Sequence, residues 1–343
     1  MARNYFGFFL LIVLVLCGAA LGAYLRWSTG EVGAIQARLF ASVSQTAMSG
    51  ILPVIQKQKT DAENITLLFA GDIMLSRAVG DVIQKNNDPR FPFLRIKTYL
   101  DSADLRFANL EGPISDRGAN QGSIYSFRDD PKTIEGLTYA GFNVLSVANN
   151  HSMDWGRDAL TQTIELLEAN HIVPVGAGRN ETEANDPKTV EVKNNRIIFL
   201  GYTTLLPKSL NAKDAAPGLS TFDVKKVSET IRELKSFNQA NIIIVSMHWG
   251  EEYQAYANAE QKRIAHALID AGADLIVGTH PHVVQEVERY EEGWVAYSLG
   301  NFVFDQNFSD ETVRSVLLKV TAGANKILSV ALVPIKINGN FQP

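Results

Sequence analysis

The stretch AHALIDAGADLIVGTHPHVVQ at residues 265–285 shows the pattern on which the fold of this chain depends. Apolar residues recur at helical spacing up to Ala271, and Gly272 ends the helix. The apolar run at residues 274–278 then predicts a buried strand, and two histidines separated by a proline follow it. This order is typical of α/β proteins, which place their chemistry just beyond the carboxyl ends of strands.

The same order recurs along most of the chain. Between two of the predicted strands, Leu160, Ile164 and Leu167 mark a helix that closes near Asn170. The C-terminal part instead carries a series of strand-like runs, so we expect mixed sheets flanked by helices. The predicted buried strands span residues 65–71, 104–110, 142–148, 197–203, 241–247 and 274–278, and the C-terminal runs span 283–289, 294–304, 313–321 and 327–337.

Polar residues stand at or just beyond the ends of these strands. They are Asp72, Glu111, Asn150, His248, His280 and His282. Singly, each has an ordinary interpretation, because an aspartate after a strand often caps a helix and a lone histidine is often a hydrogen-bonded structural residue. Together, carboxylates, an amide oxygen and imidazoles suit one or two divalent ions such as Zn, Mn or Fe, so we predict a metal site. His171 and His266 lie in or beside helical patterns and are assigned to structure.

Composition excludes several classes of protein. The 343 residues are 46% hydrophobic and 20% charged, which allows one large domain or two. The net charge of −5 has no long run of one sign, so we expect no nucleic-acid partner. The single cysteine, Cys17, excludes an internal disulfide framework and a cysteine-rich zinc module.

The N-terminus has the pattern of a membrane segment. Residues 5–25 are 21 uncharged, mostly apolar residues between Arg3 and Arg26, about the length that a helix needs to span a bilayer. We predict a retained single-pass anchor over residues 1–27 that leaves the remaining chain on the extracytoplasmic side of the cell membrane. A cleaved signal peptide is the alternative, because Ala20-Leu21-Gly22 resembles a small-x-small cleavage site.

Residues 28–63 are predicted to link this anchor to a domain at residues 64–343. Apolar residues recur at helical spacing from Val32 to Ile51, which indicates an amphipathic helix before Pro53. A juxtamembrane stalk is the favoured interpretation, and a partner-binding helix is the alternative.

Seven segments carry a resemblance to a known family. The sequence resembles the bacterial capsule-synthesis (CapA-like) proteins of poly-γ-glutamate biosynthesis, whose domain is similar to the calcineurin-like metallophosphoesterase fold. The resemblance implies an α/β domain, an αββα sandwich of mixed sheets flanked by helices. The matching segments are FAGDIMLSR at 69–77, FANLEGPIS at 107–115, FRDDP at 127–131, GFNVLSVANNHSMDWG at 141–156, MHWGEEY at 247–253, AHALIDAGADLIVGTHPHVVQ at 265–285 and YSLGNFVFD at 297–305.

The resemblance also implies roles for the strand-end residues. Asp72 matches the first acidic ligand, Glu111 takes the place of the second and bridging acid, and Asn150-His151 matches the Asn-His pair. In that scheme one ion is held by Asn150, His248 and His280, the other by Asp72 and His282, and Glu111 is shared.

Two departures from the phosphatase pattern bear on the number of ions. Met74 stands where that pattern has a histidine, and Asn109-Leu-Glu111 stands where it has Gly-Asp-x-x-Asp. One ion thus loses a nitrogen ligand. We therefore expect either a single ion or a second ion that is weakly held.

His151 is the candidate catalytic residue. The resemblance implies that it protonates the leaving group, a task that suits an imidazole; the alternative is a supporting role beside the ligand Asn150. Asp154 either orients His151 or caps the helix expected to begin at Trp155, and the cap is the favoured interpretation.

Further candidates could contact substrate. Arg128 suits a carboxylate or phosphate, because a guanidinium pairs with either in bidentate fashion. Each candidate also has a structural alternative: a surface ion pair for Arg128, packing for Trp249 and a turn position for Asn301. The full set is Arg128, Trp249, Glu252, Ser298 and Asn301.

Three functions fit these residues. The resemblance implies an extracytoplasmic protein of poly-γ-glutamate synthesis or export with a metal-dependent hydrolase site, whose partners are an anionic polymer and a membrane synthase or export protein. The second is a surface-tethered metallophosphoesterase that acts on phosphorylated envelope substrates. The third is a non-enzymatic subunit that binds polymer or a synthase. The retained ligands favour the first over the third.

Overall fold

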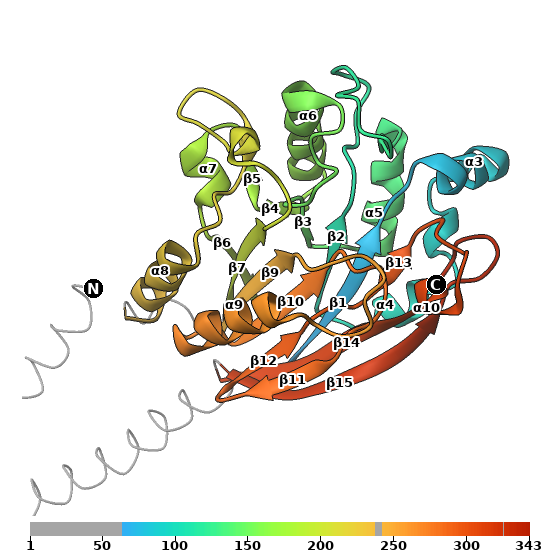
Figure 1. Cartoon of the computed structure of the whole chain (residues 1–343). Coiled ribbons are helices and arrows are strands. Elements are labelled where there is room, and N and C mark those ends of the chain that lie inside the picture. Colours follow the sequence, from blue (N-terminus) through green and yellow to red (C-terminus); the bar gives the residue numbers. More distant parts are fainter. Residues whose placement is uncertain (1–63, 237–241, 325) are drawn as a thin grey trace, which may run out of the picture. The chain divides into compact units, whose positions relative to one another are not determined.

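A computed structural model describes residues 64–236, 242–324 and 326–343 (Figure 1). Two β-sheets face each other, and helices cover their outer faces, which gives the four-layer αββα arrangement (Figure 1). The predicted anchor (residues 1–27) and linker (28–63) lie outside the described residues. Within the described ranges, no helix combines the length and the apolar character needed to cross a bilayer.

The first sheet has the strand order β15-β14-β1-β2-β3-β4, and β13 pairs with β1. Strands β1 to β4 and β13 are parallel to their neighbours among these strands, whereas β14 and β15 are antiparallel. The strands are β1 (Ile65–Ile73), β2 (Leu105–Leu110), β3 (Val144–Ser146), β4 (Val173–Val175), β13 (Asn301–Val303), β14 (Arg314–Gly323) and β15 (Lys326–Lys336).

The second sheet has the order β11-β12-β10-β9-β7-β6. Its four central strands are parallel, and β6 and β11 are antiparallel edges. A two-stranded sheet of β5 (Ala177–Gly178) and β8 (Gly218–Leu219) is separate. The strands of the second sheet are β6 (Lys188–Val192), β7 (Asn195–Thr203), β9 (Ile242–His248), β10 (Leu275–Thr279), β11 (Val287–Tyr290) and β12 (Gly293–Ala296).

The helices bury their apolar faces against the outer sides of the sheets. Those on the first sheet are α3 (Arg77–Asn86), α4 (Lys97–Leu100), α5 (Ile134–Ala140) and α6 (Gly156–Ala169); those on the second are α8 (Val224–Ser236) and α9 (Ala259–Asp270). The shorter pieces are α7 (Glu181–Asn185), α10 (Asp310–Val313), η1 (Phe91–Phe93), η2 (Pro131–Thr133) and η3 (Lys208–Leu210).

The core between the sheets is apolar and aromatic. Phe107 of the first sheet stacks on Phe199 of the second with ring centroids 5.8 Å apart, and Phe69 lies 5.7 Å from Phe107. These three rings are fully buried. The strands that carry them read as continuous apolar runs because both faces of each sheet are covered.

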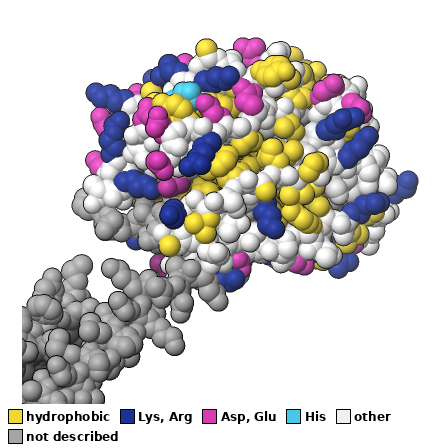
Figure 2. Space-filling model, turned by 90° about the horizontal axis from the view of Figure 1, so that it is seen from below, with side chains coloured by type: hydrophobic (Ala, Val, Ile, Leu, Met, Phe, Trp, Pro, Cys, Tyr) yellow, Lys and Arg dark blue, Asp and Glu magenta, His cyan; other side chains and the backbone are white. Residues whose placement is uncertain are grey.

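One surface of the domain carries solvent-exposed apolar side chains. Figure 2 views it from the side of β11, β12, β14 and β15, where apolar side chains gather among charged ones. The edge strand β15 exposes Leu328 and Leu332. It also carries Lys326, Pro334 and Lys336, residue types that discourage pairing of an edge strand with another chain.

The predicted mixed α/β architecture matches the structure, and all six buried strands form. The C-terminal runs differ in detail, because the run predicted at 294–304 divides into β12 and β13, which belong to different sheets. Gly300, with a positive φ of 72°, turns the chain between them. The run predicted at 283–289 forms a strand only at β11.

Candidate metal centre

The strand ends of both sheets meet at one place, because parallel strands bring their carboxyl ends to the same edge. In the first sheet, Asp72 on β1 is in register with Asn109 on β2, and β2 leads to Glu111. In the second sheet, His248 on β9 is in register with Thr279 on β10, just before the His280-Pro-His282 turn. The predicted carboxylate and imidazole ligands named here are all buried.

The two carboxylates are held by backbone contacts and by Asn109. The amide of Asp72 donates to Gly300 O at 3.1 Å. This close approach requires glycine at position 71, since a Cβ there would lie 1.8 Å from Gly300 O. Asn109 Nδ2 donates to Asp72 Oδ1 at 2.8 Å and to Glu111 Oε2 at 3.3 Å, so one amide orients both acids.

His248 and Asn150 face each other across the two sheets. His248 Nε2 lies 2.7 Å from Asn150 Oδ1, and its Nδ1 lies 3.0 Å from Thr279 Oγ1. The rings of His248 and His280 are 4.9 Å apart. The amide oxygen of Asn150 and the rings of His248 and His280 therefore lie close together.

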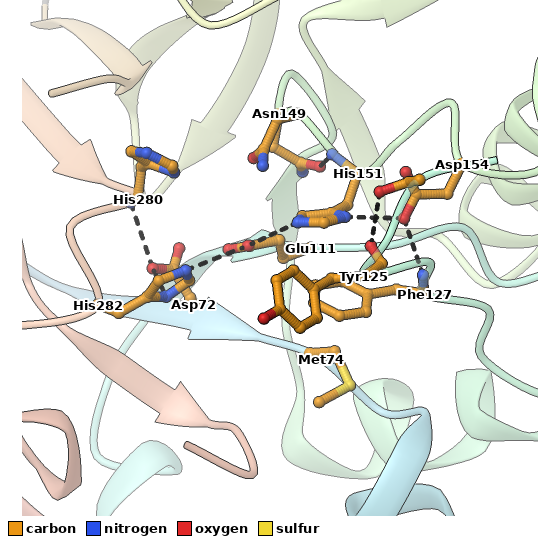
Figure 3. Close-up of polar contacts among 12 residues, drawn as sticks. Asp72, Met74, Glu111, Tyr125, Phe127, Asn149, His151, Asp154, His280 and His282 are labelled. Carbon is orange, nitrogen blue, oxygen red and sulfur yellow. Dashed lines mark hydrogen bonds and ion pairs between the residues drawn. The ribbon is translucent and has the colours of Figure 1, made fainter. Parts of the chain in front are cut away.

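His282 lies beside the carboxylates (Figure 3). Its Nε2 is 3.6 Å from Glu111 Oε1, and its Nδ1 is 3.4 Å from Asp72 Oδ2. Nδ1 also lies 2.9 Å from Asn301 Oδ1, which fixes the ring. The His280 amide donates to Asp72 Oδ2 at 3.3 Å and thus ties the histidine turn to β1.

Potential ligand atoms form two groups. In each group, one ligand atom per residue lies within 4.8 Å of the others: the first group is Asp72, Glu111 and His248, and the second is Glu252, His280 and His282. Zinc lies about 2.0–2.2 Å from each of its oxygen and nitrogen donors, so the donor atoms of one ion must lie about this close to one another.

Unsatisfied buried atoms and shifted pKa values agree with a cation at this place. Within the part of the chain that the structure describes, Glu111 Oε1 and His280 Nδ1 have no hydrogen-bond partner. Burial raises the pKa of Glu111 well above its usual value. Burial lowers the pKa of His280 to about 4 and that of His248 well below normal, so both imidazoles offer lone pairs at neutral pH. The donor set therefore fits a divalent cation.

His282 is the exception among these imidazoles. Burial alone would lower its pKa, but the charges of Glu111 and Asp72 raise it to about 9. Two buried carboxylates thus attract a positive charge to this ring. A bound cation would supply that charge instead.

His151 stands beside this cluster and is held by Asp154 (Figure 3). Its Nδ1 lies 2.7 Å from Asp154 Oδ2, and its Nε2 lies 3.9 Å from Glu111 Oε1. The Phe127 ring stacks on the imidazole at 3.9 Å, and the Phe127 amide donates to Asp154 Oδ2 at 2.8 Å. The favoured cap interpretation of Asp154 was wrong: α6 begins at Gly156, and its N-cap, Trp155, makes no side-chain cap hydrogen bond.

Met74 lies where the phosphatase pattern has a histidine, and it supplies no nitrogen. The side chain is fully buried within the apolar cluster under the first sheet. Its sulfur accepts a hydrogen bond from Ser76 Oγ at 3.1 Å. Met74, which replaces the histidine of the phosphatase pattern, is thus a packed core residue.

Three of the five candidate substrate contacts are occupied by structural interactions. Arg128 Nε donates to Ser115 O, and its guanidinium lies 4.1 Å from the Trp155 ring centroid. Trp249 is buried, and its Nε1 donates to Tyr297 O. Ser298 is likewise buried, and its hydroxyl donates to a backbone carbonyl.

The other two candidates reach the metal cluster. Asn301 is buried and orients His282. Glu252 is exposed, and its carboxylate belongs to the second ligand group, with His280 and His282.

Sequence reasoning missed Asn109 and Asn149 as part of the site. Asn149 Nδ2 donates to Asn109 Oδ1 at 3.1 Å and to Leu110 O at 2.7 Å. The available signal was strand periodicity, since residues two apart point to the same side of a strand and Asn109 precedes Glu111 by two.

No such signal was available for Phe127. It lies in the segment at 127–131 and His151 in the segment at 141–156, and nothing in either segment indicates that the two rings touch. His171 and His266 were assigned to structure from the sequence. His266 pairs with Glu288 and stacks on Tyr290, and neither histidine belongs to the two ligand groups among the described residues.

Comparison with solved structures finds proteins that share this fold. The domain is similar to a hypothetical protein from Thermus thermophilus (TM-score 0.53, 17% identity, 79% of this chain and 99% of the other). It is also similar to a putative 5′-nucleotidase from Staphylococcus aureus (TM-score 0.52, 16% identity), covering 82% of this chain and 56% of that protein. The domain therefore shares its overall fold with these two proteins.

Sequence comparison identifies the family. The chain belongs to the family described as bacterial capsule synthesis protein PGA_cap, whose family model matches residues 66–306. It is 31% identical over 312 residues to the capsule biosynthesis protein CapA of Bacillus anthracis, covering 89% of this chain and 75% of the relative. It is 33% identical over 287 residues to the PGA biosynthesis protein CapA of Bacillus subtilis (strain 168), covering 82% and 74%. The resemblance drawn from the motifs is confirmed.

Proposed function

We propose that this chain is a membrane-anchored, extracytoplasmic protein of poly-γ-glutamate biosynthesis or export that carries a metal-dependent hydrolase site. Membership of the capsule synthesis family and the names of the two Bacillus relatives support the biosynthetic role. The observation that carries the hydrolase role is the convergence of two buried carboxylates, an amide oxygen and three imidazoles at the strand ends.

Six residues of the centre would bind the cation. The cation would be held by Asp72, Glu111, Asn150, His248, His280 and His282. A divalent cation bound there would polarise the target oxygen and lower the pKa of a water molecule toward neutrality. Its identity among Mn, Zn and Fe is left open by the donor set.

His151 has the geometry of a general acid. Asp154 accepts from Nδ1 and stabilises the positive charge of a protonated ring, which leaves Nε2 facing the carboxylate cluster to give its proton to a leaving group. Phe127 covers one face of the ring and restricts its rotation. The low exposure of His151 keeps competing water from the proton.

The membrane part of the proposal rests on the sequence. Residues 5–25 would anchor the chain in the cell membrane as a single span, with the domain on the extracytoplasmic side. There the domain would meet an anionic polymer or a phosphorylated substrate, and a membrane synthase or export protein as partner.

A second function is favoured by one specific observation. The fold is similar to that of a putative 5′-nucleotidase. A surface-tethered phosphoesterase acting on envelope phosphate esters would use the same metal ligands and the same His151. The two functions differ in the bond that is cleaved.

The test measures metal content and turnover on the purified full chain. The substrates are p-nitrophenyl phosphate esters and γ-linked glutamate oligomers, and the variants are His151→Ala and Asp72→Asn. His171→Ala, which changes a histidine outside the cluster, is the matched control. We expect bound metal and cleavage of the glutamate oligomers that both site variants lose and the control retains.

The other outcomes assign the other functions. A metal-loaded protein that cleaves only phosphate esters would establish the phosphoesterase. A protein that holds no metal and cleaves neither substrate would leave a polymer- or synthase-binding subunit as the function.

A further inference from the structure

Compared with the phosphatase pattern, the metal centre lacks one nitrogen ligand, at position 74. Met74 occupies the place of a histidine in the phosphatase pattern, and its sulfur faces the Ser76 hydroxyl in an apolar environment. A cation on that side of the centre would have only Asp72, His282 and the shared Glu111 as donors in the implied scheme. Any donor that completes its coordination must come from another segment.

Glu252 lies within reach of His282, one of these donors, and of His280. One of its carboxylate oxygens and one ring nitrogen each of His280 and His282 all lie within 4.8 Å of one another. His280 is only 7% exposed, and its Nδ1 has no partner among the described residues. A carboxylate with two imidazoles is a donor set suited to zinc, manganese or iron.

The segment that carries Glu252 is fixed to the histidine turn. The Trp249 amide donates to Thr279 O at 3.2 Å, and the Tyr253 amide donates to Pro281 O at 2.8 Å. These two bonds flank Glu252 on both sides and join it to the residues before and between the two histidines. The backbone on both sides of Glu252 is therefore held beside the histidine turn by contacts that do not depend on the charge of its carboxylate.

Tyr253 adds to this fixation. Its φ of 62° lies in the left-handed region, which costs an aromatic residue energy that other contacts must offset. Its ring lies 6.2 Å from that of His282 and 5.3 Å from that of Phe308, and its hydroxyl accepts from Gln306 Nε2 at 3.1 Å. The Glu252–Tyr253 corner is thus determined by contacts around the metal centre.

We infer that Glu252 is a metal ligand which, with His280 and His282, holds a second divalent cation, a grouping that differs from the implied scheme, in which His280 and His282 hold different ions. This inference rests on the proposed metal centre and extends it from one secure cation to two. Glu252 is exposed, so the second cation exchanges more readily than the first, which is held by the buried group of Asp72, Glu111 and His248.

The test is Mn²⁺ binding by the full chain, compared among wild type, Glu252→Ala and Glu251→Ala. Both glutamates are exposed neighbours, so the two variants remove the same charge and are expected to fold equally. Isothermal titration gives stoichiometry and affinity, and electron paramagnetic resonance reports the spin coupling of two Mn²⁺ ions about 3.5–4 Å apart. Neither readout requires turnover of a substrate.

We expect two Mn²⁺ ions and a coupled signal in wild type and in Glu251→Ala. In Glu252→Ala, the second site should bind at least ~10-fold more weakly and the coupled signal should disappear, while the first ion stays. Two equally tight ions in all three proteins, or a single ion in all three, would overturn the role of Glu252 and leave the metal centre standing. A wild-type chain that binds no Mn²⁺, Zn²⁺ or Fe²⁺ would overturn the metal centre itself.

Discussion

Replacing Asp129 with asparagine should make the protein more resistant to unfolding at alkaline pH. Asp129 is fully buried, and its Oδ1 accepts from the Leu75 amide at 3.1 Å. Among the described residues, its Oδ2 has no hydrogen-bond partner. Burial therefore raises its pKa from 3.8 to about 8, although the Leu75 amide and the Ser76 hydroxyl oppose the shift.

The sign of the pH dependence follows from this raised pKa. Between pH 4 and 8 the folded state keeps the proton on Asp129, whereas the unfolded state releases it. The stabilisation is complete below the unfolded pKa and is lost as the pH rises through the folded pKa. The loss is about 1.4 kcal/mol per pH unit, or about 6 kcal/mol over the whole interval, as an order of magnitude.

The assay is urea-induced unfolding of the full chain at pH 5, 6, 7 and 8, followed by tryptophan fluorescence. Asparagine resembles the protonated acid and does not ionise, so the free energy of unfolding of Asp129→Asn minus that of wild type should rise with pH by about 1 kcal/mol per unit. Other titrating groups cancel in this difference. Asp130→Asn removes the same charge from an exposed neighbour and should give a flat difference. A flat difference for Asp129→Asn as well would refute a protonated Asp129.

Three further perturbations test other parts of the structure. Asp154→Asn should leave the metal content unchanged and lower turnover roughly 100-fold, because it removes the charge that stabilises protonated His151; equal loss in Asp158→Asn, an exposed change on α6, would contradict this role. Gly71→Ala should reduce the free energy of unfolding by about 3 kcal/mol or more through contact with Gly300 O, while Gly339→Ala, where a Cβ meets open space, should be neutral in the same urea titration. Removing the cation with a chelator should lower the melting temperature by about 5 °C, as expected for a ligand near 100 times its Kd, and an unchanged melting curve would argue against a resident cation.

The strands and most of the convergent side chains could be predicted because they are local features. A buried parallel strand must be apolar on both faces, so runs such as 65–71 and 274–278 are visible without a structure. The polar residues that end these runs must then meet, since parallel strands share an edge. Asp72 and His280, which are 208 positions apart in the chain, are joined by a hydrogen bond for this reason.

Contacts that depend on how loops cross the strand ends could not be predicted. Asp154 has the sequence context of a helix cap, yet the N-cap of α6 is Trp155, and the Asp154 carboxylate pairs with His151 instead. Phe127 reaches His151 from a different segment, and only the folded chain brings the two rings together.

The sequence by itself determined the α/β class, the family and the types of donor atom, because apolar periodicity and short motifs record which residues are buried and which end a strand. Only the tertiary structure decided which donors group with which. It placed Glu252 with His280 and His282, oriented His282 through Asn301, and gave Trp249 and Ser298 structural contacts. The physical reason is that distances between segments depend on sheet order, loop path and packing, which no local stretch of residues specifies.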